Sequence, residues 1–304
     1  MTISKVRSCP RRRSRAAGIP KRSALKSVSN ASRRGQDYNE IITYSFISPK
    51  DYAQLRIGEE AERAIRIKNP IGEDMSIMRT TLAPSMLTTL VRNIRRGNPR
   101  ARLFELASVY IAKELPLAEM PEERKTLCFG VYGAGEDFFS AKGVFEAIAS
   151  EFGIRFAYEA AEKPFLHPGK CADVLLEGEK IGYLGELAPD LAEELSLETN
   201  VYIGELDFAK LQGSLSFAVR FKPLPAHPEA VRDLALVADE NILCADIEKG
   251  ISDACKYVTA VKLFDVYRGA QVAAGHKSVA FSLTFRAPDR TLTDEEVQAA
   301  MDKV

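Results

Sequence analysis

Residues 221–304 alternate between strand and helix patterns in an order that few folds accommodate. Two prolines in the segment 221–225 resist helix, and strands are predicted at 232–238, 258–267 and 277–285. A helix is predicted at 246–255. A second helix is predicted to begin after Thr293, because Glu296 stands three residues later and completes a capping box. The predicted order is therefore strand, helix, strand, strand, helix.

This order is that of a ferredoxin-like βαββαβ unit without its fourth strand. We expect such a truncated sheet to keep an open edge where the fourth strand would pair, and an open edge invites aggregation or pairing with a partner. The run Ser278–Phe285 alternates between apolar and small polar residues. One of its two faces, either the one with Phe281 and Phe285 or the opposite one, is predicted to pack against the two helices.

Residues 37–212 contain more strands than helices and join them by short connections. Strands are predicted at 41–47, 103–111, 126–132, 172–176, 180–184 and 200–206. Helices are predicted from Pro84 onward, at 137–152 and at 189–195, where apolar residues recur at helical spacing. Core residues predicted for the helix at 137–152 are Phe139, Val144, Phe145, Ile148 and Phe152. The pattern favours an α+β fold in which an antiparallel sheet is flanked by helices, and residues 213–220 are predicted to link it to the last domain.

Residues 1–36 form a basic leader with eleven Lys and Arg residues and no acid. Three interpretations are open: an artefact of a frame error or an alternative start, a disordered basic tail, or an organellar targeting segment. Because the formal net charge of the chain is zero, residues 37–304 carry a net negative charge. Any contact of the folded part with nucleic acid therefore needs local basic patches.

The five cysteines and three histidines are dispersed and show no metal-ligand spacing. Buried free thiols in a reducing, cytoplasmic environment are expected for Cys9, Cys128, Cys171, Cys244 and Cys255. We predict no bound metal. No apolar run approaches the roughly 20 residues that a membrane-spanning helix needs, so no membrane partner is expected.

Several blocks of the chain are similar to those of a known family. They include Ile42-Thr-Tyr-Ser-Phe, Met78-Arg-Thr-Thr-Leu, Asp137-Phe-Phe-Ser-Ala-Lys-Gly, Leu263-Phe-Asp-Val-Tyr-Arg-Gly and the run 278–297. Over about residues 36–304 the chain resembles the C-terminal part of the β subunit of bacterial phenylalanyl-tRNA synthetase. The resemblance implies a class II synthetase-like domain over residues 37–212 and an anticodon-binding domain of ferredoxin-like fold over residues 221–304.

The class II synthetase-like domain is predicted to have no catalytic activity. Catalysts of that class hold the phosphates of ATP with arginines on the sheet, because phosphoryl charge requires fixed cationic donors. Phe208, and Leu103 with Phe104, stand where the resemblance places those arginines. Glu105, Glu186 and His167 have no spacing that requires acid–base chemistry. The loop Gly130–Gly135 precedes a helix but matches neither glycine-rich phosphate-binding motif. We therefore predict no catalytic residue and no nucleotide site.

Two groups of basic residues are candidate contact sites. Single-stranded anticodon loops are recognised by stacking on aromatic rings or guanidinium planes and by hydrogen bonds to base edges. The RNA-binding candidates of the last domain are Lys222, Arg232, Tyr267, Arg268, Lys277, Arg286 and Arg290. Tyr267 and Phe264 are equally compatible with a place in the core. A second cluster, a candidate contact with RNA or with an acidic subunit, consists of Arg92, Arg95, Arg96, Arg100 and Arg102. A solvated helix end is an equally open interpretation of that cluster.

What the resemblance implies is a non-catalytic subunit that packs on a catalytic α subunit in a heterotetramer and holds the anticodon stem-loop of tRNA. The assembly would charge tRNA with phenylalanine using ATP and Mg²⁺, neither of which this chain is predicted to bind. The alternative hypothesis is a stand-alone RNA-binding or structural accessory protein without ligase activity.

Overall fold

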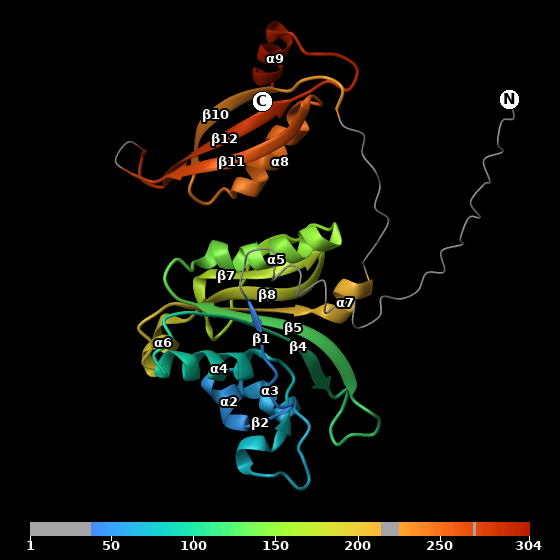
Figure 1. Cartoon of the computed structure of the whole chain (residues 1–304), viewed down its shortest axis with the longest axis vertical. Coiled ribbons are helices and arrows are strands. Elements are labelled where there is room, and N and C mark those ends of the chain that lie inside the picture. The colour runs from blue at the N-terminus through green and yellow to red at the C-terminus, as the bar shows by residue number, and fades with distance from the viewer. Residues whose placement is uncertain (1–37, 214–224, 270–271) are drawn as a thin grey trace, which may run out of the picture. The chain divides into compact units, whose positions relative to one another are not determined.

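The computed structural model describes residues 38–213, 225–269 and 272–304 (Figure 1). They form two compact units, one on each side of residues 214–224. The predicted leader, residues 214–220 of the predicted linker, Cys9 and Lys222 lie outside the described residues. Within those residues no helix is long and apolar enough to cross a membrane.

The first unit is built on a seven-stranded sheet in the order β1-β4-β5-β9-β8-β7-β6. Its strands are β1 (Asn39–Glu40), β4 (Ala101–Ile111), β5 (Glu122–Tyr132), β6 (Ala157–Ala160), β7 (Leu166–Leu176), β8 (Glu179–Leu187) and β9 (Val201–Asp207). All neighbours pair antiparallel except β1 and β4, which are parallel. The α+β prediction is thus correct in class, but the sheet is mixed rather than antiparallel. The parallel strand was missed because two residues are too few for a periodic pattern.

Helix α5 (Phe138–Phe152) covers one face of this sheet together with α7 (Phe208–Gly213) (Figure 1). Asp137 caps α5, since its carboxylate accepts from the Ser140 amide at 2.6 Å. Val144, Phe145, Ile148 and Phe152 are buried as predicted, but Phe139 is 73% exposed and that prediction is wrong. At 100° per residue Phe139 lies well away from the apolar stripe that Phe145 and Ile148 share.

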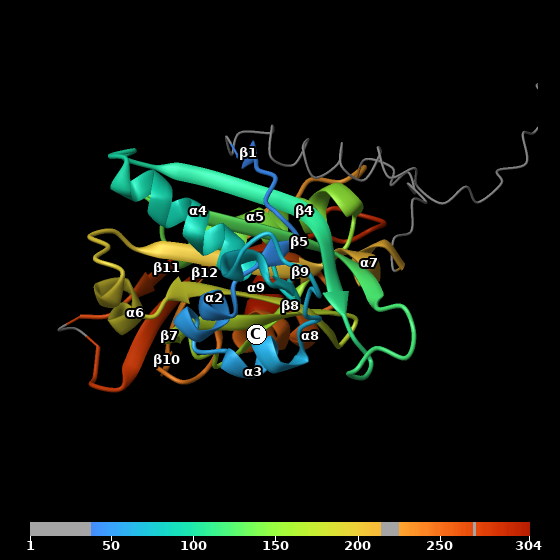
Figure 2. The same ribbon diagram turned by 90° about the horizontal axis from the view of Figure 1, so that it is seen from below.

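The opposite face of the sheet carries α4 (Ala83–Arg95) and α6 (Pro189–Glu194), with α2 (Pro49–Gln54) packed beside α4. Figure 2, seen from below, shows α4 running along this face. Helix α4 begins at Ala83, one residue before the predicted start at Pro84, and buries Met86, Leu87 and Leu90. Short elements complete the unit: β2 (Phe46–Ile47), α3 (Gly58–Arg63), the 3-10 turn Glu73–Met75 and β3 (Ile77–Met78). Of the strand predicted over 41–47, only its last two residues form a strand, β2. Strand β1 lies just before the predicted start.

The second unit has a three-stranded antiparallel sheet in the order β10-β12-β11. Its strands are β10 (Ala230–Asp239), β11 (Val258–Tyr267) and β12 (His276–Phe285), and its helices are α8 (Cys244–Ala254) and α9 (Asp294–Met301). The predicted capping box is confirmed, because Thr293 accepts from the Glu296 amide and Glu296 accepts from the Thr293 amide. Val279, Phe281, Leu283 and Phe285 are buried against both helices, which settles the direction of the alternating run.

Candidate protein- and RNA-binding surfaces

An apolar segment lies exposed on the first unit, between β1 and β2. Ile42 is 91% exposed and Tyr44 is 72% exposed, and Phe46 is partly exposed beside them. The segment borders a hollow of about 520 Å³ that is also lined by Met75, Thr88 and Arg92. Large apolar side chains gathered on a surface mark interaction sites more often than scattered ones do.

A buried ion pair holds this apolar segment in place from below. Arg79 and Glu105 are both almost fully buried, and Arg79 Nη1 lies 3.3 Å from Glu105 Oε1. Glu105 accepts from the amide of Thr43 at 3.0 Å and from its hydroxyl at 2.8 Å, while Arg79 donates to the carbonyl of Tyr44 at 3.2 Å. The backbone at Thr43 and Tyr44 is therefore tied to β4, and its apolar neighbours are presented on a rigid base.

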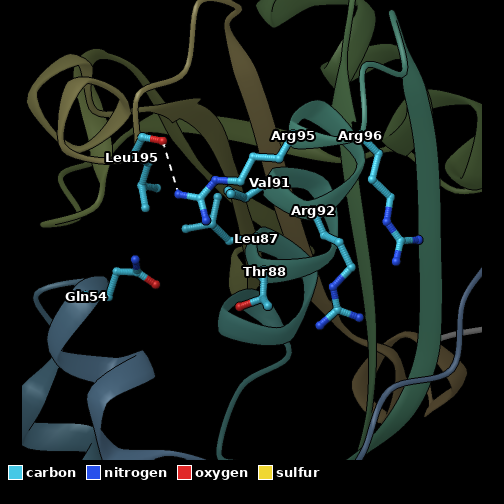
Figure 3. A pocket seen from close by; sticks show the side chains of 8 residues that line it. All are labelled: Gln54, Leu87, Thr88, Val91, Arg92, Arg95, Arg96 and Leu195. Atoms are coloured by element: carbon cyan, nitrogen blue, oxygen red, sulfur yellow. Dashed lines mark hydrogen bonds between the residues drawn. The ribbon is translucent and has the colours of Figure 1, made fainter.

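Three arginines flank a second hollow of about 410 Å³ at the end of α4 (Figure 3). Arg92, Arg95 and Arg96 stand on the last turn, and Arg95 donates to the carbonyl of Leu195 at 3.5 Å. Among the described residues none of the three forms an ion pair with a carboxylate. The two other predicted members lie apart from these three. Arg100 is exposed in the turn before β4, and Arg102 pairs with Glu136 at 2.6 Å on β4.

The sheet of the second unit leaves one face free of helices. On this open face the central strand β12 carries Ser278, Ala280, Ser282 and Thr284, the half-exposed neighbours of its buried residues. On the neighbouring strand β11, Tyr267 lies opposite Ser278 and is 42% exposed. Phe264, at a bulge of β11, is 55% exposed. Because the side chains of β12 on this face are small and the aromatic side chains of β11 are exposed, a planar ring of a ligand has room to approach the sheet.

The structure places the basic candidates of the second unit around the domain, and each is already engaged. Arg232 pairs with Asp294, Arg268 with Glu240, Arg286 with Glu229 and Arg290 with Glu296. Lys277 is buried, and its ammonium donates to the carbonyl of Glu240 at 2.9 Å. The four arginines are thus each paired with a carboxylate, and Arg268 and Lys277 both contact Glu240.

Two family models match the chain, and together they cover most of it. One is described as the phenylalanyl tRNA synthetase beta chain CLM domain and matches residues 7–208. The other is described as the ferredoxin-fold anticodon binding domain and matches residues 225–304. The chain belongs to the phenylalanyl-tRNA synthetase β chain family.

Relatives of this family cover nearly the whole chain. It is 42% identical over 275 residues to the phenylalanine–tRNA ligase β subunit of Clostridium tetani, covering 89% of this chain and 34% of that protein. It is 39% identical to the β subunits of Clostridium acetobutylicum, over 271 residues and 88% of this chain, and of Moorella thermoacetica, over 278 residues and 87% of this chain. The chain thus spans about a third of the length of these relatives, 34% in each case.

The three residues predicted to stand at phosphate-binding positions are apolar and buried. Phe208 is 2% exposed and packs with Phe104 in the core beneath α5, and Leu103 packs in the core beneath α4. None of these side chains offers a donor to a phosphate. In this structure the three side chains contribute to the cores on the two faces of the sheet.

The remaining polar candidates hold the fold together. Glu105 is bound to Arg79, Glu186 to Lys170 at 2.7 Å, and His167 Nδ1 accepts from the Gly169 amide at 2.9 Å. Asp137, two residues after the loop 130–135, already caps helix α5 with its carboxylate. A carboxylate at that place competes with a phosphate for the same amides. Among the described residues no three His, Cys, Asp or Glu side chains are grouped to hold a metal.

Two surface features escaped sequence reasoning. The sequence around Ile42 and Tyr44 looks like an ordinary buried strand, so their exposure could not be predicted. In the structure the Arg79–Glu105 ion pair holds the backbone of this segment. The small residues of β12 were considered only as one of two alternative core faces of the strand. Their alternation with large apolar residues was the one signal that could have indicated an open sheet face.

Proposed function

We propose that this chain supplies the C-terminal modules of a phenylalanine–tRNA ligase β subunit. In this proposal the first unit packs on the catalytic α subunit of a heterotetramer, and the second unit binds the anticodon stem-loop of tRNA. ATP and Mg²⁺ serve the α subunit, and the assembly works in the cytoplasm. We assign the first module to residues 37–212 and the second to residues 221–304, joined by residues 213–220.

The observation that carries the RNA proposal is the open face of the β10-β12-β11 sheet. Unpaired bases stack on exposed aromatic rings, and Tyr267 and Phe264 offer such rings beside the small side chains of β12. Acids outnumber bases in residues 225–304, and the arginines of the domain are paired. We therefore assign recognition to stacking and base-edge contacts, with the arginines adding local contacts and Lys277 supporting the sheet from inside.

Binding of an anticodon stem-loop RNA, followed by fluorescence anisotropy, tests this proposal. Tyr267→Ala should weaken binding about 5- to 150-fold, as expected when one stacked base is lost. Tyr44→Ala is the matched control, since Tyr44 is an exposed tyrosine of the other unit. The arginines of the second unit should add little to the salt dependence of binding, because each already faces a carboxylate. Absence of binding at low salt would exclude both this role and the stand-alone RNA-binding alternative.

Docking of the α subunit is assigned to the apolar segment at Ile42 and Tyr44 and the hollow beside it. Its large exposed apolar side chains stand on a base held by the Arg79–Glu105 pair, which is the combination that anchors of protein interfaces require. The neighbouring arginines of α4 add cations that suit an acidic subunit face.

Co-purification of the chain with a phenylalanine–tRNA ligase α subunit tests the docking assignment. Ile42→Asp should weaken the complex by roughly 2 kcal/mol or more, the range of interface anchors. Phe139→Asp, which changes another strongly exposed apolar residue, on α5, should leave the complex intact. An α complex that is insensitive to every change in the second unit, together with no RNA binding, would instead support the purely structural alternative.

A further inference from the structure

A polar cavity of about 560 Å³ lies within the first unit, apart from the surfaces described above. It is formed where α3, the end of β4, the start of β5 and the strands β8 and β9 meet. Its walls include the apolar side chains of Ile57, Ile111 and Phe165. Its charged lining residues are Glu60, Arg63, Lys113, Arg124, Lys163 and Glu205. Cations outnumber carboxylates in this lining.

Glu205, at the base of the cavity, is satisfied by the protein itself. It accepts from the hydroxyl of Thr81 at 2.5 Å, from the hydroxyl of Tyr183 at 3.0 Å and from the amide of Leu82 at 3.3 Å. Burial raises the pKa of this carboxyl, so its negative charge is disfavoured. The acid that would most oppose an anion in the cavity is therefore weakened and already bound.

Lys163 is the cation of the lining that lacks a carboxylate. Its ammonium lies 4.2 Å from the centroid of the Tyr183 ring, and the residue is half-buried. Within the described residues no acid forms an ion pair with it, whereas Arg124 faces Asp207 at 3.6 Å, Lys113 faces Glu119 at 2.7 Å and Arg63 faces Glu60 at 3.9 Å. A ring face offsets only part of the cost of taking an ammonium out of water.

We infer that this cavity binds a small molecule that joins one anionic group to an apolar body. The anionic group pairs with the Lys163 ammonium, with Arg124 nearby, and the apolar body lies against Phe165, Ile57 and Ile111. The ring of Phe165 meets that of Tyr183 edge-on with centroids 5.9 Å apart, so the wall beside Lys163 is rigid and aromatic. Glu60 belongs to the same lining, its carboxylate accepts from the Thr80 hydroxyl at 2.9 Å, and its charge disfavours a second anionic group.

Ligand-observed saturation-transfer NMR on the full chain, titrated with 3-phenylpropanoate, tests the inference. Saturable binding is expected for this carboxylate, whereas 2-phenylethylamine, which has the same body and the opposite charge, should not bind. Inorganic phosphate separates the two parts of the proposal, since an anion without an apolar body should bind far more weakly. Equal binding of the amine or of phosphate would overturn the proposed ligand class.

Substitution of Lys163 assigns the binding to the cavity. Lys163→Met keeps the length and apolar stem of the side chain and should weaken 3-phenylpropanoate about tenfold or more, while Lys163→Arg should retain binding. Lys142→Met is the matched control, because Lys142 also stands over a tyrosine ring, at 4.3 Å from that of Tyr158, but outside the cavity. Unfolding curves of each variant confirm that the fold is kept. Unchanged binding in Lys163→Met, or no saturable binding to the unaltered chain, would refute the inference.

Discussion

Removal of Arg79 is the perturbation for which the structure makes the firmest prediction. The Arg79→Met substitution keeps most of the side-chain volume but leaves the Glu105 carboxylate buried with only Thr43 as a side-chain and backbone donor. The carbonyls of Ser108 and Tyr44 also lose a donor, at 3.1 Å and 3.2 Å. An uncompensated buried charge costs about 3–5 kcal/mol. We expect a loss of that size in the stability of the first unit.

Hydrogen–deuterium exchange is the suitable assay, because the two units of the chain need not unfold together. Amides of β4 and β5 report on the first unit, and amides of β12 serve as an internal reference. The free energy of opening in β4 should fall by the predicted amount, while that in β12 should not change. The Arg56→Met variant is the matched control. Arg56 pairs with Asp190 and Glu194 at the surface, so its loss should lower stability far less than the loss of Arg79 does.

The double variant Arg79→Met/Glu105→Leu tests whether the orphaned Glu105 carboxylate causes the loss of stability in Arg79→Met. If the cost comes from the orphaned carboxylate, removing both charges should recover much of the stability, with a coupling of up to about 3 kcal/mol between the two sites. A loss below about 1 kcal/mol in Arg79→Met, or a double variant that simply sums the two single losses, would refute the reasoning.

Four further predictions concern packing, helix propensity, capping and pH. A Cβ at Gly204 would lie 2.3 Å from Phe129 Cε1, so Gly204→Ala should lower stability by about 1–3 kcal/mol in thermal unfolding. Gly143→Ala on α5 meets no atom within 4 Å and should instead stabilise the first unit by up to about 1 kcal/mol. Thr293→Ala removes the cap of α9 and should cost the second unit about 1 kcal/mol, read as faster amide exchange in that helix. Because burial raises the pKa of Glu205 above its ordinary 4.5, the folded chain holds this proton more tightly than the unfolded chain. Its contribution to stability is therefore greatest below that pH and declines as the pH rises through the raised pKa. Glu205→Gln should flatten that decline in urea unfolding measured across pH, and an identical slope in both proteins would show that another group causes it.

The second unit was the part most completely predictable from the sequence. Strand β11 matches its predicted bounds, and β10, α8 and β12 differ by one or two residues at their ends. These elements carry strong local signals, namely the alternation of β12 and the capping box at Thr293. Such signals depend on neighbours within a few residues, which are visible in the sequence.

The first unit was predicted in its long elements and missed in most of its short ones. Helices α4, α5 and the short α6 and strands β4, β5, β8 and β9 were found, and β7 was found in its second half. Helices α2, α3 and α7 and strands β3 and β6 were not predicted. Six-residue helices and two-residue strands are too short for a periodicity to stand out, and they form because the surrounding structure supplies their partners. Phe139 was misplaced for a related reason, since an apolar residue beside a helical stripe looks like part of it.

The family and the two-module organisation could be recognised from the sequence alone, because both depend on residue identity along the chain. Only the tertiary structure decided which charges are free. Arg232, Arg268 and Arg286 were equal candidates in the sequence, yet each faces an acid from another part of the chain. The exposure of Ile42 and the unpaired ammonium of Lys163 were decided in the same way. Burial and pairing are properties of neighbours brought together by folding, and no single stretch of residues contains them.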